Sequence, residues 1–365
     1  MILFLAVALF LCIACNSNPT PLPADNCIEL LPVDSLVTCS DGIFSIGSMC
    51  FTKNGNLVLL DDVTGSLHVY QDNEHIASLS CIGEGPLEYT SPRELTALPE
   101  GGFMLNCPPD MKFLFFDETL ECTGATFFHD FDLRPGTPVR TQFLSKDLFV
   151  GQSYFCSDFS ECGTEVSVWR INDDLSVNRE YEIRTRFAER FHPIKYLIDT
   201  RIASAVEPDN QIIVFSDVTT NNYELNLIQF SEGIDVTETV TREFQTEMKT
   251  DEEIEAEVSR IRQAWIRGTG SDIGFQYEAN KENFVIIGLY FASNSSLWVR
   301  RNSPFRIHFD VFNGEFSFQR EVALAVPDEY MTDGWLVAFG DAVIAVSPVN
   351  PEIDPVVYFY NIENL

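Results

Sequence analysis

Three arginines stand at corresponding places in a repeated pattern and offer the sharpest chemistry in this sequence. Arg93, Arg140 and Arg201 each precede a polar turn that a short apolar run follows. Guanidinium groups donate planar, paired hydrogen bonds that match a carboxylate or a phosphate. If the three arginines converge, they form an anion site in an otherwise acidic protein. The alternative is that acidic loops pair with them and hold neighbouring parts of the fold together.

Another set of polar residues ends the apolar runs that follow the turns. These residues are Asp61, Asp62, Asn106, Gln152, Asp217 and Arg300. We expect them to form a polar rim, in which Asp61 or Asp62 is a candidate base or metal ligand. Carboxylate and amide oxygens are ligands that Ca²⁺ prefers, but no DxDxDG-type loop accompanies them. We therefore expect no cofactor, with calcium as the alternative.

The remaining candidates do not assemble into a recognisable catalytic centre. Tyr89 and Trp335 offer flat surfaces to a sugar or an aromatic ligand, although packing inside the fold is the more ordinary role of such rings. The sequence contains no GxSxG motif, and its five histidines do not pair with a serine and a carboxylate at converging positions. The sequence therefore predicts no catalytic residue and no metal site.

A pattern of one turn and two hydrophobic runs recurs six times and indicates the fold that positions these residues. Each turn tolerates positive φ and can reverse one strand into the next. The six turns are 54–56, 100–102, 146–147, 209–210, 294–296 and 340–341. Six such repeats predict an all-β, six-bladed β-propeller. Because the innermost strand of each blade lines a central channel, the arginines and the polar rim are expected at one channel mouth, where function usually sits.

Two segments fall outside the six repeats. One is 28–46, and we expect one of its strands to join the last blade and close the ring, since closure removes exposed edges. The other begins with the capping box Thr250-Asp251-Glu252-Glu253, after which apolar residues recur on one helical face from Ile254 to Trp265. It predicts one inserted α-helix at about 250–266, which packs on the propeller flank or docks a partner.

Charge and length restrict the partners and the domain count. The chain has 55 acidic and 23 basic side chains and a net charge of -32. This charge repels phosphate backbones and anionic lipid surfaces, so nucleic acid is excluded as a partner. A length of 365 residues alone would suggest two domains, but the repeats favour one closed unit. We expect that unit to be a monomer.

The start of the chain carries the signals of export. Residues 1–14 are almost wholly apolar and too short to span a bilayer comfortably, which predicts a signal peptide, with a retained membrane anchor as the alternative. The segment Leu11-Cys12-Ile13-Ala14-Cys15 resembles a bacterial lipobox, in which Cys15 carries the lipid, and an ordinary secretory peptide without a lipid is the alternative. Residues 15–27 then form a lipidated tether and residues 28–365 the propeller domain. Because no acidic run follows Cys15, we expect an outer-membrane lipoprotein that faces the periplasm.

The other cysteines all precede residue 163. In an exported protein, Cys156 and Cys162 can close a hairpin with a disulfide. The alternative is that the cysteines are small buried residues of the core.

A join between the first two blades carries a resemblance to known proteins. The segment Gly83-Glu84-Gly85-Pro86-Leu87-Glu88-Tyr89, followed by Pro92, is similar to the GxGPxEY-type join of NHL-like propellers. Together with the lipobox, it resembles the six-bladed, TolB-like propeller lipoproteins of Gram-negative bacteria. The resemblance implies a propeller fold and a location in the cell envelope. It implies no single reaction.

These observations lead to two hypotheses of function. The first is an envelope-anchored propeller that acts as a binding or scaffold module for a protein, peptide or glycan, without a catalytic centre. The alternative is a hydrolase or lyase that acts on an anionic substrate at the channel mouth. Convergent, unpaired arginines favour the enzyme, whereas arginines neutralised by acidic loops favour the scaffold.

Overall fold

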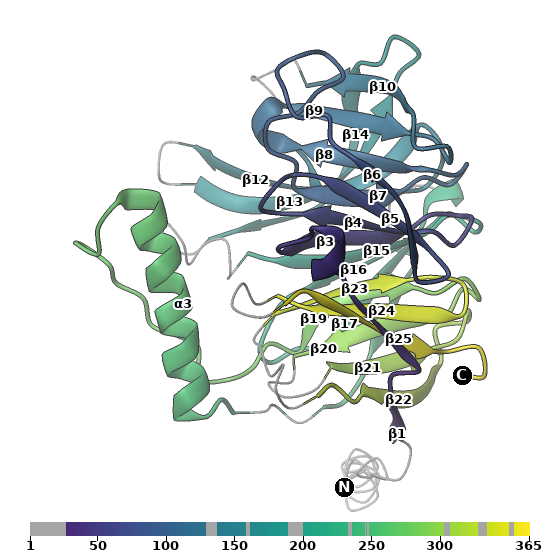
Figure 1. Ribbon diagram of the computed structural model, residues 1–365. Helices are drawn as coiled ribbons and strands as arrows, with labels where there is room; N and C mark the ends of the chain where they lie inside the picture. Colours follow the sequence, from purple (N-terminus) through teal and green to yellow (C-terminus); the bar gives the residue numbers. More distant parts are fainter. Residues whose placement is uncertain are drawn as a thin grey trace, which may run out of the picture.

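The computed structural model confirms an all-β architecture built as a six-bladed propeller (Figure 1). It describes residues 27–128, 137–157, 161–188, 200–232, 236–244, 246, 248–302, 307–327, 334–349 and 354–365. The predicted signal peptide, Cys15 and nearly all of the predicted tether lie outside the described residues.

In blades one to four the four antiparallel strands follow sequence order from the channel outwards, and blades five and six follow the same order except for an N-terminal strand at the outer edge of each. Blade one contains β3 (Ile46–Phe51), β4 (Leu57–Asp61), β5 (Leu67–Gln71) and β6 (Glu74–Leu79). Blade two contains β7 (Glu94–Ala97), β8 (Phe103–Cys107), β9 (Lys112–Phe116) and β10 (Cys122–Phe127). Blade three contains β11 (Val139–Phe143), β12 (Leu148–Ser157), β13 (Glu161–Ile171) and β14 (Val177–Phe187).

The second half of the ring repeats this plan. Blade four contains β15 (Ile202–Glu207), β16 (Ile212–Asp217), β17 (Glu224–Gln229) and β18 (Glu238–Thr241). Blade five contains β19 (Ile286–Phe291), β20 (Leu297–Arg301), β21 (Ile307–Phe312) and β22 (Phe318–Leu324). Blade six contains β23 (Trp335–Phe339), β24 (Val343–Pro348) and β25 (Val356–Asn361).

The N-terminal segment completes blade six and closes the ring. Strand β2 (Asp34–Val37) pairs antiparallel with β25, so the predicted closure is confirmed. Strand β1 (Cys27–Leu30) pairs parallel with β22 and gives blade five a fifth strand, which the sequence did not predict. The start of the described chain is therefore held by two neighbouring blades.

The hydrophobic core is divided into six clusters, and each cluster lies between two adjacent blades. Between blades one and two, for example, Val58 and Val69 pack with Leu105 and Leu114. The same arrangement recurs at the other five interfaces, including the one between blades six and one. Because each blade buries both of its faces against its neighbours, a long chain forms one unit without one enlarged central core.

The strand bounds confirm the six predicted turns, and each turn connects the first and second strands of its blade. At one of them Gly102 has a φ of 74°, and a Cβ there would lie 2.0 Å from the carbonyl oxygen of Phe116. Only glycine fits this turn without a backbone shift. The connections between blades, and those between second and third strands, lie at the opposite ends of the strands. We call that side the mouth face.

The predicted inserted helix is present as α3 (Asp251–Thr269), in the connection between β18 and β19. The Thr250 side chain accepts a hydrogen bond from the Glu253 N–H at 3.2 Å, and Glu253 accepts one from the Thr250 N–H at 2.6 Å. This confirms the capping box. Figure 1 shows α3 standing beside the propeller. Within the described residues, no helix combines the length and apolar character that a membrane span requires.

The contacts of α3 tie it to the segments that precede and follow it. Glu257 pairs with Lys249 at 2.6 Å and accepts a hydrogen bond from the Tyr277 hydroxyl. The ring of Trp265 lies 6.4 Å from the ring of Phe275. The insertion itself leaves β18 and enters β19 on the mouth face, because it connects an outer strand to the next inner strand.

Candidate functional site

A cavity of about 390 Å³ lies where the six innermost strands meet. Residues of β3, β7, β11, β15, β19 and β23 all line it, so it lies on the propeller axis, and we call it the channel pocket. Its charged lining residues are Glu94, Arg140 and Arg300. Apolar and aromatic residues such as Leu95, Tyr290 and Trp335 form much of the remaining wall.

Bulges in the innermost strands shape this pocket. The pairing of β11 with β12 shifts between Val139 and Gln142, and the pairing of β19 with β20 shifts between Ile286 and Gly288. Bulges bend a strand and redirect its side chains, and they are common beside functional sites. Arg140 lies within the first bulge, with a φ of 50° that is rare for a residue other than glycine. Such backbone strain at a pocket suggests a functional constraint.

The carboxyl group of Glu94, at the start of β7, is held by donors from two neighbouring strands. Its Oε2 accepts a hydrogen bond from the Arg140 N–H at 2.7 Å and one from Asn106 Nδ2 at 3.3 Å. The same Asn106 amide group donates to the Pro138 carbonyl oxygen at 2.8 Å. Asn106 is fully buried, so it fixes the orientation of Glu94.

Burial raises the pKa of Glu94 to about 7, although these donors and the charge of Arg140 favour the ionised form. Loss of solvent around the carboxyl group therefore outweighs its hydrogen bonds. At neutral pH the group is present in both protonation states, which suits a residue that accepts and returns a proton. Among the described residues that line the pocket, Glu94 supplies the one carboxyl group.

Arg140 and Arg300 bring positive charge to the pocket from blades three and five. Within the described part of the chain, no carboxylate lies within ion-pair distance of either guanidinium. Arg300 Nη1 donates to the Trp335 carbonyl oxygen at 2.9 Å. Arg300 belongs to the second strand of its blade and lies opposite Gly288 in the register. A Cβ at Gly288 would lie 2.8 Å from the Tyr290 hydroxyl oxygen, so glycine leaves room there for the Tyr290 ring.

The structure does not bring the three predicted arginines together in this pocket. Arg140 lines it, whereas Arg93 and Arg201 are not among its lining residues. Arg93 Nη1 lies 3.6 Å from Asp62 Oδ1, and both side chains are about half exposed. The Arg201 guanidinium lies over the Phe284 ring, 4.9 Å from its centre. Both arginines therefore contact other parts of the mouth face.

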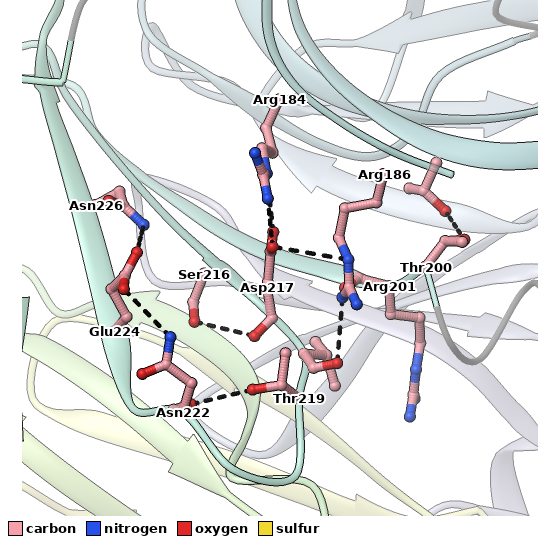
Figure 2. Close-up of polar contacts among 12 residues, drawn as sticks. Arg184, Arg186, Thr200, Arg201, Ser216, Asp217, Thr219, Asn222, Glu224 and Asn226 are labelled. Atoms are coloured by element: carbon pink, nitrogen blue, oxygen red, sulfur yellow. Dashed lines mark hydrogen bonds and ion pairs between the residues drawn. The ribbon is translucent and has the colours of Figure 1, made fainter. Parts of the chain in front are cut away.

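Asp217, at the end of β16, is held in a polar cluster between blades three and four (Figure 2). Arg184 donates two hydrogen bonds to its carboxylate, at 3.1 and 2.6 Å, and Arg186 Nε lies 3.7 Å away. Arg186 Nη1 also donates to the carbonyl oxygen of Arg201 at 2.8 Å. Figure 2 shows the Arg201 side chain turned away from Asp217. This cluster joins the outer strand of blade three to blade four.

Asp61 is buried and organises the loop after β4. Its carboxylate accepts hydrogen bonds from the N–H groups of Ser45 and Val63, both at 3.1 Å, and from the Thr64 hydroxyl at 2.6 Å. These bonds replace the backbone partners that the turn lacks. Asp61 is not among the residues that line the channel pocket.

Tyr89 is fully buried between blades one and two, and its hydroxyl donates to the Gly65 carbonyl oxygen at 2.8 Å. Of the two predicted aromatic surfaces, Trp335 therefore lines the pocket and Tyr89 packs in the core. Gln152 also lines the pocket. In the described ranges, no three His, Cys, Asp or Glu side chains are grouped so that they could hold a metal ion.

Glu94 is the functional candidate that the sequence reasoning missed. It directly follows Arg93, which the repeat pattern had singled out, and begins the same inner strand. Successive side chains of a strand point to opposite sides, so only one of two neighbours faces a given partner. A signal was available, because Asn106, the predicted rim residue, is the register partner of Glu94.

Comparison with solved structures shows the fold of this chain. It is similar to a member of the DUF4221 family from Bacteroides vulgatus, with a TM-score of 0.50 and 11% identity over 92% of this chain and 98% of that one. It is also similar to a gluconolactonase from Xanthomonas campestris, with a TM-score of 0.49 and 10% identity over 87% and 86% of the two chains.

A third similar structure is virginiamycin B lyase from Staphylococcus aureus, with a TM-score of 0.42 and 10% identity over 90% and 98% of the chains. No family model matches this sequence, and no curated protein matches it either. At 11% identity the likeness to the DUF4221 structure bears on the fold alone.

The prediction of a binding or scaffold module without a catalytic centre is wrong. It depended on the lack of a familiar motif in the sequence. The channel pocket instead brings together a carboxyl group with a raised pKa and two guanidinium groups, those of Glu94, Arg140 and Arg300.

Proposed function

We propose that this protein is a hydrolase or a lyase that acts on a small anionic substrate in the channel pocket. The observation that carries the proposal is the carboxyl group of Glu94, which shares the pocket with two guanidinium groups and whose pKa burial raises to about 7. An acid–base group is most effective when its pKa is close to the working pH.

Substrate binding is the role of Arg140 and Arg300. A negative charge on the substrate would neutralise guanidinium groups that have no carboxylate partner among the described residues. Charge-assisted hydrogen bonds of this kind are about twice as strong as neutral ones. Because the protein as a whole carries a net charge of -32, this locally positive pocket also selects where an anion can bind.

Glu94 performs the proton transfer. In a hydrolase, its carboxylate takes a proton from the water that attacks the substrate, and the resulting acid returns that proton to the leaving group. In a lyase, the carboxylate takes a proton from carbon, and the electron pair of that C–H bond expels the leaving group. In both cases the nearby guanidinium groups stabilise negative charge that develops on the substrate.

The test is turnover of a panel of anionic esters, lactones and glycans by the purified protein and two variants. Glu94→Gln should lower kcat at least about 100-fold, since acid–base catalysis contributes roughly that much. Arg93→Ala is the matched control, because Arg93 lies on the same face outside the pocket. Equal loss of turnover in both variants, or no effect of Glu94→Gln, would contradict the assignment. We expect activity to survive a chelator, and its loss would point to the calcium alternative.

We also propose that the chain is an outer-membrane lipoprotein of the TolB-like propeller group, anchored through Cys15 and facing the periplasm. The lipobox-like segment 11–15 and the proline-rich sequence after it support this proposal. Metabolic labelling with a fatty acid should modify the wild-type chain and spare Cys15→Ala. Fractionation with protease treatment of intact cells then tests the leaflet, since a periplasmic domain should be protected. Labelling that persists in Cys15→Ala would rule out this anchor.

A further inference from the structure

We propose that Arg300 binds a carboxylate of the substrate side-on, and that the substrate is a small cyclic molecule carrying a single carboxylate. This inference names the substrate class of the proposed enzyme, and it rests on the proposed function for the reaction that the substrate undergoes. Binding itself does not depend on turnover, so the two can be tested apart.

One edge of the Arg300 guanidinium is hydrogen-bonded, and the Nε of the other edge has no hydrogen-bond partner among the described residues. Nη1 donates to the Trp335 carbonyl oxygen at 2.9 Å and is the one side-chain atom of Arg300 with a hydrogen bond to a described residue. Nε is buried and has no hydrogen-bond partner in the described part of the chain. The Nε–H and the neighbouring terminal N–H form the side-on edge of the group. Two coplanar oxygens of a carboxylate match this edge.

A buried donor without a partner is unusual and needs a reason. The next residue, Arg301, lies at the same end of β20 and has carboxylate ion-pair partners: its Nε lies 3.4 Å from Asp310 Oδ1, and its Nη2 lies 3.1 Å from Glu321 Oε2. Arg300 lines the channel pocket and lacks such a carboxylate among the described residues. A bound ligand carboxylate would supply the missing partner.

The charges of the pocket set the charge of the ligand. Arg140 and Arg300 contribute two positive charges, and ionised Glu94 contributes one negative charge, which leaves one positive charge. A ligand with one carboxylate brings the net charge of the pocket to zero when Glu94 is in its ionised form. A ligand with two negative charges would keep Glu94 protonated, because a like charge nearby disfavours ionisation.

The aromatic residues that line the pocket indicate the chemistry of the uncharged part of the ligand. Tyr290 and Trp335 both line it, close to the Arg300 anchor on the Trp335 carbonyl. The Tyr290 ring is stacked on Phe339 at 5.1 Å, so it offers a fixed surface. Flat side chains of this kind bind the faces of sugar or aromatic rings. A volume of about 390 Å³ is near the lower end for small-molecule sites, which favours one ring with its carboxylate.

Calorimetric titration with glucuronate and benzoate tests this inference on the wild-type protein. Their neutral counterparts, methyl glucuronate ester and benzamide, and inorganic phosphate serve as comparison ligands. We expect at least one of the two acids to bind at least tenfold more tightly than its neutral counterpart and than phosphate. Glucuronate and benzoate separate a sugar acid from an aromatic acid. Equal affinity for acid and neutral counterpart would overturn the inference, as would failure of both acids to bind.

The variants Arg300→Lys and Arg300→Gln assign the binding to this residue. Lysine keeps the charge but loses the side-on edge, so we expect Kd to rise about tenfold, and glutamine should raise it about 100-fold. Arg93→Gln should bind as the wild type does. If a variant fails to fold, the ¹⁵N chemical shift of Arg300 Nε is measured in the wild-type protein instead. This shift should move on titration with the acid, and an unmoved shift would refute the contact.

The Glu94→Gln variant separates this inference from the proposed function. It should keep carboxylate affinity within about threefold while turnover is lost. If cyclic acids bind through Arg300 but no ester, lactone or glycan derived from them is turned over, the enzyme proposal fails and the carboxylate site stands. If turnover occurs and Arg300→Gln leaves KM and kcat unchanged, the carboxylate site fails, together with the role of Arg300 in substrate binding, and catalysis by Glu94 stands.

Discussion

Replacing Glu94 by glutamine removes a carboxyl group whose ionisation the folded protein opposes. Burial raises its pKa from 4.5 to about 7, so between these values the native state holds a proton that the unfolded chain releases. The contribution of Glu94 to the free energy of unfolding therefore falls as the pH rises from 4.5 to about 7, and it is constant at higher pH. A difference of about 2.5 pKa units corresponds to about 3 kcal/mol. Glutamine keeps an oxygen that can accept from Asn106 and Arg140, but it does not ionise.

The expected result is a change in the relative stability of the two proteins with pH. Near pH 4.5 both side chains are neutral, and above pH 7 only the wild type carries a costly charge. The free energy of unfolding of Glu94→Gln minus that of the wild type should therefore be about 3 kcal/mol larger at pH 8 than at pH 4.5, because the variant is relatively more stable at the higher pH. Other titrating groups are common to both proteins and cancel.

Urea unfolding followed by tryptophan fluorescence, at several pH values across this range, measures the difference. Glu74→Gln serves as the control, because Glu74 is exposed on β6 and lies outside the pocket. A stability difference for Glu94→Gln that stays constant from pH 4.5 to 8 would refute the argument from burial. A carboxyl resonance of Glu94 that titrates near 4.5 in ¹³C spectra would do the same.

Three further changes test other parts of the structure. Asp310→Ala removes a fully buried carboxylate that lies 2.5 Å from Arg242, so thermal unfolding should show a loss of about 3–5 kcal/mol, and a loss below about 1 kcal/mol would contradict a buried ion pair. Gly102→Ala introduces a Cβ 2.0 Å from a backbone carbonyl oxygen, and urea unfolding should show a loss of roughly 1–3 kcal/mol in the free energy of unfolding. Gly124→Ala is the control in the same blade. Because the space around Gly124 is open, the loss should be less than about 1 kcal/mol. Thr250→Ala removes the N-cap of α3 at a cost of about 1 kcal/mol. Faster hydrogen exchange in the first turn of α3 should report that cost, and unchanged exchange would contradict it.

Much of the fold follows from local sequence. The six turns between first and second strands, and the apolar runs on both sides of them, are read over a few residues each, because turn formation and strand alternation are short-range properties. The inserted helix was also predicted from its capping box and apolar spacing, and its first residue differs by one from the expected start. Ring closure by a strand from 28–46 followed from the need to cover an edge. The parallel pairing of β1 with β22 had no local signal.

The candidate site depends on contacts between blades that are far apart in the sequence. Repeat spacing selected Arg93, but the direction of side chains at the start of β7 placed its neighbour Glu94 in the pocket. Arg140 reaches the pocket from a bulge with positive φ, and Arg300 reaches it from a second strand opposite Gly288. Neither the bulges nor the directions of these side chains can be predicted from the spacing of residues along the chain.

The sequence by itself determined the number of blades, the turns and the helix, because short-range alternation, capping and turn chemistry specify them. It also contained every polar residue of the pocket. Only the tertiary structure decided which of those residues share the channel and which form ion pairs elsewhere on the mouth face. The pKa of Glu94 near 7 is likewise a tertiary property, because it results from the exclusion of solvent by strands of several blades.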